Sequence, residues 1–119
     1  PPKTVRVDTS TMESMELPTR EDDLELTVDS GSRDVWVRGQ KIDPPLPKKE
    51  FDILECLFIN RGNAVERDTI AGVGWPERPS DVGNDEIDQY IRRLRLKIET
   101  TPSKPTLIIT RRGHGYMIR

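Results

Sequence analysis

The most regular hydrophobic pattern of the chain lies over positions 84–99. Its four aliphatic residues recur at steps of four, three and four, which places them on one stripe of an α-helix. The stripe predicts a helix with one face for a core, and it consists of Ile87, Ile91, Leu94 and Ile98. At about 100° per residue the opposite face carries fixed positive charge. The residues of that face and its flanks are Gln89, Arg92, Arg93, Arg95, Leu96 and Lys97.

Shorter alternating patterns precede this helix. Apolar and polar residues alternate over 24–28 and 35–37, and a third apolar position follows at 41–42. Alternation with a period of two is typical of half-buried strands, and stretches rich in Gly, Ser and Asp separate them. The pattern predicts a small antiparallel meander. Trp36 stands between two valines of this meander, so we expect its side chain on the solvent face.

Two more helices and a hairpin complete the pattern. Apolar stripes predict a helix over 47–60 and a shorter one over 66–73. Near the end, two apolar segments, 107–109 and 116–118, are joined across glycines that allow a tight hairpin. The predicted fold class is α+β: a winged helix-turn-helix with an N-terminal antiparallel β-meander, three helices and a C-terminal β-hairpin wing.

Several side chains have expected places in this fold. Asn84, or Asp81 one turn earlier, is expected to cap the long helix. Cys56 is expected to be a small buried residue. Trp75 is interpreted either as a plug beneath its loop or as a contact for a partner. A solvated face is expected from the carboxylates of the first helix, Glu50, Asp52 and Glu55.

The charge of the chain is unevenly distributed. Its 119 residues carry a net charge of −2, which by itself does not mark a nucleic-acid binder. Acids outnumber bases over 1–60, whereas 89–119 holds eight basic residues against the single acid Glu99. Charges farther apart than about 8–10 Å are screened at physiological salt, so attraction to DNA depends on such local patches.

Composition divides the chain and narrows its chemistry. Residues 1–23 are polar and acidic, and we expect a linker or loosely docked arm there, with Val5 and Val7 as a candidate strand. Residues 24–119 form the predicted domain. One cysteine excludes an internal disulfide, and with one histidine it argues against a zinc site. The chain begins at Pro1 and not at Met, so we expect it to be a piece of a longer protein.

Neither a membrane-spanning apolar run nor a signal-peptide pattern occurs, and we expect a cytoplasmic protein with no membrane segment in this fragment. No Ser/His/Asp set, paired-carboxylate cleft or phosphate-cradling glycine loop can be assembled. We therefore expect no enzyme, no metal and no cofactor.

Three segments carry a resemblance to a known family. Residues 46–54 read Leu-Pro-Lys-Lys-Glu-Phe-Asp-Ile-Leu, residues 91–99 read Ile-Arg-Arg-Leu-Arg-Leu-Lys-Ile-Glu, and residues 110–116 read Thr-Arg-Arg-Gly-His-Gly-Tyr. They resemble the first-helix entry, the recognition helix and the wing of the winged-helix DNA-binding output domains of OmpR/PhoB-type response regulators. The resemblance covers 24–119, and the last two motifs are specific in this order and spacing.

The resemblance implies a four-stranded N-terminal sheet and double-stranded DNA as the partner. The recognition helix 84–99 would lie in the major groove, and the wing 110–116 would reach the minor groove. Similar domains bind direct repeats as head-to-tail pairs, so a homodimer on DNA is expected. The loop 74–83 corresponds to a contact surface for RNA polymerase. Its candidate contact residues are Trp75, Glu77 and Arg78.

The resemblance also implies individual roles. Arg93 would contact a base edge, and Arg92 and Arg95 would contact phosphates or base edges. Arg112 would enter the minor groove, where a narrow groove concentrates negative potential, and Thr110 would contact a phosphate. The expected DNA-binding residues are Gln89, Arg92, Arg93, Arg95, Lys97, Thr110, Arg111 and Arg112.

Four residues depart from the family pattern. Pro47 stands where the family often has a capping threonine, so the first helix is expected to start differently. Asp85 and Glu86 stand at the start of the helix, where they would repel phosphate or accept from cytosine N4. Leu96 is interpreted as an ordinary exposed leucine or, less favoured, as a contact for a thymine methyl. The departures at Asp85, Glu86 and Leu96 motivate an alternative function, a winged-helix protein-interaction module with weak or no DNA binding.

Overall fold

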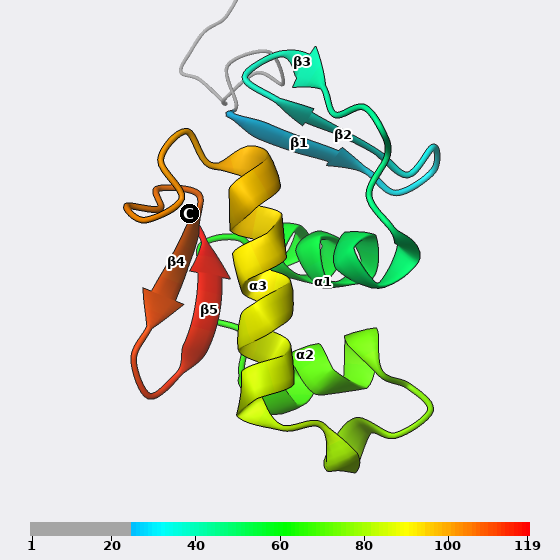
Figure 1. Cartoon of the computed structure of the whole chain (residues 1–119), viewed down its shortest axis with the longest axis vertical. Coiled ribbons are helices and arrows are strands. Elements are labelled where there is room, and N and C mark those ends of the chain that lie inside the picture. Colours follow the sequence, from blue (N-terminus) through cyan, green and yellow to red (C-terminus); the bar gives the residue numbers. More distant parts are fainter. Residues whose placement is uncertain (1–24) are drawn as a thin grey trace, which may run out of the picture.

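The structure is a computed structural model that describes residues 25–119 (Figure 1). Its strands are β1 (Leu26–Asp29), β2 (Asp34–Val37), β3 (Gln40–Lys41), β4 (Ile108–Arg111) and β5 (Gly115–Ile118). Its helices are α1 (Lys48–Ile59), α2 (Arg67–Gly74), the single 3₁₀ turn η3 (Pro79–Asp81) and α3 (Asn84–Ile98). The predicted α+β winged-helix class is confirmed. The expected arm, with Val5 and Val7, lies outside the described residues.

The N-terminal sheet is an antiparallel meander in the order β1-β2-β3. Leu26 pairs with Val37, and Val28 with Val35, so that four apolar side chains face the core and are buried. Trp36 lies on the other face and is only partly buried, as the alternation predicted. The family resemblance implies four strands, whereas the described residues form three in this sheet.

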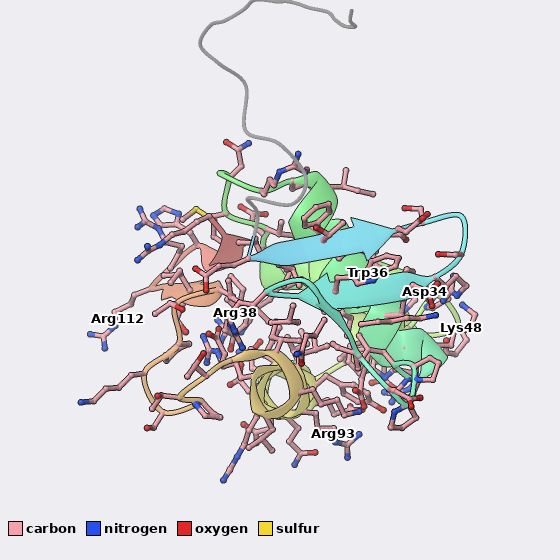
Figure 2. All side chains as sticks on the ribbon, turned by 90° about the horizontal axis from the view of Figure 1, so that it is seen from above. Asp34, Trp36, Arg38, Lys48, Arg93 and Arg112 are labelled. Atoms are coloured by element: carbon pink, nitrogen blue, oxygen red, sulfur yellow. The ribbon has the colours of Figure 1, made fainter. Side chains whose placement is uncertain are left out.

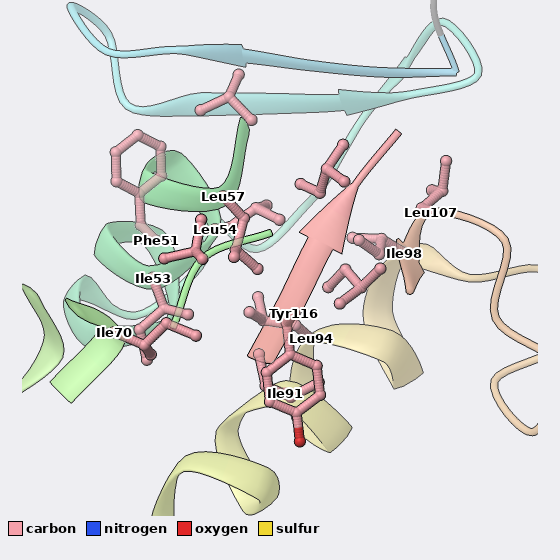
Figure 3. Close-up of a cluster of buried hydrophobic side chains, with 14 of the residues drawn as sticks. Phe51, Ile53, Leu54, Leu57, Ile70, Ile91, Leu94, Ile98, Leu107 and Tyr116 are labelled. Carbon is pink, nitrogen blue, oxygen red and sulfur yellow. The ribbon is translucent and has the colours of Figure 1, made fainter. Parts of the chain in front are cut away.

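Helix α1 supplies the centre of the core (Figure 3). Phe51, Ile53, Leu54 and Leu57 are each at most 1% exposed. The meander lies over one side of α1, while α2, α3 and the hairpin surround the rest (Figure 1). Full burial of one such side chain stabilises the fold by about 1.5–3 kcal/mol. The buried face of α1 is therefore a surface against which α3 packs.

Two expectations about α1 are wrong. Glu50 is 5% exposed rather than solvated, because Lys97 of α3 reaches across and places its Nζ 2.6 Å from the Glu50 Oε1. Asp52 and Glu55 are partly buried as well. Cys56 is partly buried rather than fully buried, and its burial raises the pKa of the thiol above its usual value.

The start of α3 also differs from expectation. Neither Asn84 nor Asp81 caps it; the N-cap is Gly83, whose carbonyl accepts the backbone N–H of Glu86 and of Ile87. Asp85 and Glu86 occupy the first turn, where negative charge is favourable against the helix dipole.

The C-terminal hairpin is antiparallel and packs beside α3 (Figure 1). Gly115 has φ +107°, and a Cβ there would lie 2.0 Å from the carbonyl oxygen of Val65. Glycine is therefore required where Val65 forms its bridge to Tyr116. Within residues 25–119 no helix is both long and apolar enough to span a membrane.

Candidate nucleic-acid interface

The outer face of α3 is exposed as the helical pattern predicted. Gln89, Arg92, Arg93 and Leu96 are all exposed, and Leu96 has 63% of its surface accessible. The Arg93 guanidinium lies 4.7 Å from the centre of the Tyr90 ring. A cation at this distance from an aromatic face is attracted to it. Arg93 is thus oriented on the helix surface and projects away from the core (Figure 2).

Arg95 and Lys97 are engaged with the protein. Arg95 donates from Nε and Nη2 to the carbonyl of Ile108, at 3.2 and 2.8 Å, and from Nη2 to the Thr110 Oγ1 at 2.9 Å. Lys97 forms the pair with buried Glu50. Arg95 therefore joins α3 to β4 and brings Thr110 to the edge of the helix, while Lys97 joins α3 to α1.

The wing carries two more guanidiniums. Arg111 and Arg112 are exposed at the turn between β4 and β5. Arg112 extends from the hairpin on a different side of the molecule from Arg93 (Figure 2). The helix and the wing thus present cations that diverge from each other, an arrangement suited to a ligand broad enough to contact both.

Two of the three carboxylates of α3 are paired with cations from outside the helix, which the sequence did not reveal. Asp88 lies 2.8 Å from the Nη2 of Arg67 on α2, and Glu86 lies 2.7 Å from the Nη2 of Arg78 in the loop. The hydrogen bond from Arg78 lowers the pKa of Glu86, and its own burial opposes this effect only partly. Within residues 25–119 these acids form no ion pair with the arginines of the outer face.

A second network connects α2, α3 and the wing. The buried Tyr116 donates its hydroxyl to the Asp88 carboxylate, and Arg67 donates to both groups. Burial alone would raise the pKa of Asp88, but the hydrogen bonds from Tyr116 and Arg67 hold it below its ordinary value. The hydrophobic pattern did not predict this network, because Arg67, Asp88 and Tyr116 lie far apart in sequence.

The loop before α3 presents fewer exposed residues than expected. Trp75 is 2% exposed, its ring lies edge-on to Tyr90 at 5.2 Å, and the Lys49 ammonium lies 4.9 Å from its centre. The plug interpretation of Trp75 is confirmed, and a buried ring offers no surface to another protein. Of the three residues predicted for a polymerase contact, Glu77 and Arg78 remain accessible. Residues 25–119 hold no cluster of side chains suited to a metal ion.

Three helices, a basic exposed third helix and a hairpin packed beside it define a winged helix-turn-helix domain. Residues 39–118 match the family described as "Transcriptional regulatory protein, C terminal", and the chain belongs to this family. The resemblance to OmpR/PhoB-type output domains is thereby confirmed.

The chain matches only part of a longer relative. The chain is 38% identical over 97 residues to the "Probable transcriptional regulator ycf27" of Galdieria sulphuraria, an alignment that covers 79% of this chain and 36% of that protein. The chain thus spans about a third of the length of this curated relative.

Solved structures of other regulators share the fold. Response regulator DrrB of Thermotoga maritima, described as an OmpR/PhoB homolog, matches with a TM-score of 0.67 and 37% identity, over 79% of this chain and 41% of that one. The RstA DNA-binding domain of Klebsiella pneumoniae, solved in complex with the RstA box, matches with a TM-score of 0.67 and 29% identity, over 79% of this chain and 90% of that one.

Proposed function

We propose that this chain is the sequence-specific, double-stranded DNA-binding output domain of a transcriptional regulator. The distribution of unpaired cations carries the proposal. Among residues 25–119, most cations from Arg33 to Arg78 pair with carboxylates, whereas the arginines of α3 and the wing do not. Within residues 25–119, the guanidiniums without a carboxylate partner thus gather on one helix and the adjoining hairpin, with Arg61 and Arg119 as the exceptions elsewhere. Those of the helix and the hairpin are Arg92, Arg93, Arg95, Arg111 and Arg112.

In this proposal α3 lies in the major groove, which is wide enough for a helix. Arg93 would read a base edge, since guanidinium pairs bidentately with guanine O6 and N7. Arg92 and Gln89 share the exposed face and would contact phosphates or neighbouring bases. Because Lys97 is paired with Glu50, it would contact DNA only through an ammonium already held by the protein.

The wing would follow the adjacent backbone into the minor groove. Arg112 would enter that groove, where negative potential is concentrated when the groove is narrow, and Arg111 would lie beside it. Thr110 would contact a phosphate. Arg95 donates to the Thr110 hydroxyl oxygen, which leaves the hydroxyl proton available to a phosphate. Arg95 itself would contribute by orienting the wing as well as by its charge.

The assembly around the domain follows the same proposal. Two copies would bind direct repeats head to tail, and the loop 74–83 would contact RNA polymerase, with the exposed Glu77 as its candidate contact. An upstream regulatory domain of a two-component system would control the output. The protein would act in the cytoplasm and be associated with the nucleoid when bound to DNA.

The exposed Leu96 favours one alternative. A large apolar side chain on the outer face of α3 is also compatible with a winged-helix protein-interaction module that binds DNA weakly or not at all. Selection from a random duplex pool separates the two. No enrichment of any duplex, together with a stable protein complex that Leu96→Lys abolishes, would favour the alternative.

Salt dependence and base choice test the main proposal. Binding to the selected duplex should weaken by at least about a hundredfold between 50 and 200 mM salt if several phosphates are contacted. Arg93→Ala should relax base preference at one or two positions and weaken binding to the selected site by roughly 1–3 kcal/mol. Unchanged affinity and base preference in Arg93→Ala would rule out its assigned role.

A further inference from the structure

The loop before α3 holds one guanidinium in a fixed position. Arg78 lies with Nη2 2.7 Å from the Glu86 Oε2 and Nη1 3.3 Å from Oε1, and Nη1 also donates to the carbonyl of Asp81 at 3.0 Å. Both side chains of the pair are about two-fifths exposed. A guanidinium has five N–H donors, so these bonds engage three and leave the Nε–H and one Nη2–H for another acceptor.

This pair continues a row of side chains along α3. Glu86, Tyr90 and Arg93 follow at steps of four and three, so they lie on one flank of the helix. Arg93 is held on the Tyr90 ring at the other end of the row. Seven residues of helix separate Glu86 from Arg93, about 10 Å along the axis.

Cations therefore border both sides of the outer face. Arg95 and the wing hairpin border one side, since Arg95 bonds to β4. Arg93 and Arg78 border the other. Gln89 and Leu96 lie on the strip between them. A helix inserted in a major groove has a phosphate backbone on each side and base edges in front of it, and this distribution of charge matches that environment.

We propose that Arg78 is a DNA-phosphate contact on the flank of α3 opposite the wing, and that Glu86 is its positioning residue. The inference rests on the proposed function. Glu86 alone would repel phosphate at the start of the recognition helix, but paired with Arg78 it holds a cation there. Glu86 neutralises one edge of the guanidinium and aims the remaining donors outward, and phosphate accepts such planar, paired donors well.

The first test measures the salt slope of binding. Arg78→Gln in the full chain should lower the slope against the logarithm of salt by about 1 and weaken binding roughly threefold to tenfold, on a duplex selected by the unmodified chain. Arg78→Lys should keep most of the slope because it keeps the charge. Arg33→Gln is the matched control, since Arg33 is also an exposed arginine in an ion pair, with Asp52 at 3.0 Å, and lies outside the row.

The second test uses the sign of a substitution at Glu86. If Glu86 positions Arg78, Glu86→Gln should weaken binding when Arg78 is present and strengthen it in the Arg78→Gln background, where only an unpaired carboxylate is removed. If Glu86 merely repels the backbone, Glu86→Gln strengthens binding in both backgrounds. Thermal unfolding by circular dichroism confirms that each variant is folded.

The outcomes separate this inference from the proposed function. If the unmodified chain enriches no duplex, the proposed function fails and the inference fails with it. If the chain binds and Arg93→Ala weakens it, while Arg78→Gln leaves slope and affinity unchanged, the proposed function stands and the phosphate role of Arg78 is overturned. Equal strengthening by Glu86→Gln in both backgrounds overturns the positioning role alone.

Discussion

At the scale of single residues, Glu99 connects the C-terminal end of α3 to the start of the wing hairpin. Its carboxylate is buried, with 7% of the residue exposed. It accepts the backbone N–H groups of Thr106, Leu107 and Ile108 at 2.8–3.1 Å. A single side chain thus satisfies three successive backbone donors just where the chain enters β4. The position of the wing relative to the recognition helix depends on this contact.

Replacing Glu99 by alanine should therefore be costly. A buried donor left without an acceptor costs roughly 1–3 kcal/mol, and partial access of water to the site should limit the total to about 2–4 kcal/mol. Urea unfolding monitored by circular dichroism measures the loss. Glu55→Ala is the control, because Glu55 is a partly exposed carboxylate on α1 and should change stability by under about 0.5 kcal/mol. Equal losses in both variants would contradict this role of Glu99.

At the scale of elements, helical periodicity predicted α1, α2 and α3, alternation predicted the strands of the meander, and two apolar segments joined across glycines predicted the hairpin. The stripe of α3 placed Ile87 and Ile91 in the core, and alternation placed Trp36 on the outer face of the meander. The contacts between elements escaped prediction. Periodicity within α1 predicted that Glu50 lies on a solvated face. The prediction failed because Lys97, which pairs with the buried Glu50 carboxylate, lies on α3. The pairing of Arg78 with Glu86 was missed for the same reason, since Arg78 lies in the loop before α3 and the periodicity of the helix does not report its contacts with that loop.

The pair between α1 and α3 gives a prediction that separates stability from binding. Lys97→Met leaves the Glu50 carboxylate buried without its partner, and stability should fall by about 1–3 kcal/mol, less than for a fully buried pair because Lys97 is 40% exposed. Adding Glu50→Gln should recover much of the loss. Urea unfolding measures both effects.

Lys48→Met is the control for this prediction, since Lys48 pairs with Asp52 near the surface and should cost under about 1 kcal/mol. If Lys97 acts only within the protein, the salt slope of DNA binding is unchanged in Lys97→Met. A lower slope with full stability would instead make Lys97 a phosphate contact and contradict its role in holding α3 on α1.

At the scale of the whole molecule, acid should weaken the fold through paired carboxylates. The pKa of Asp88 is held below its ordinary value by Tyr116 and Arg67, against the opposing effect of burial. A carboxyl whose folded pKa lies below its unfolded pKa, about 3.9, stabilises the fold above that pH and loses this contribution as the pH falls through the folded pKa. Stability should therefore decline from about pH 5 downward.

The variant Asp88→Asn isolates this contribution. It should be less stable than the unmodified chain at neutral pH and should lose less stability between about pH 5 and 2, because the asparagine does not titrate. Urea unfolding at several pH values measures the difference. An acid dependence identical to that of the unmodified chain would show that the network of Asp88, Arg67 and Tyr116 does not hold the carboxyl in its charged form.

Net charge and local charge make opposite predictions for the molecule as a whole. Arg112→Gln and Lys48→Gln each remove one positive charge, and Figure 2 places Arg112 on the hairpin and Lys48 on the far side of the molecule. If the proposed interface binds DNA, Arg112→Gln should weaken binding to many duplex sequences alike, roughly threefold to tenfold, and lower the salt slope by about 1. Fluorescence anisotropy with a random-sequence duplex between 50 and 200 mM salt measures both quantities.

Lys48→Gln is the control and should leave the affinity and the salt slope within twofold of the unmodified chain, because a charge farther from the duplex than about 8–10 Å is screened. Equal effects of the two substitutions would mean that overall charge, rather than the arginines of α3 and the wing, governs association with DNA.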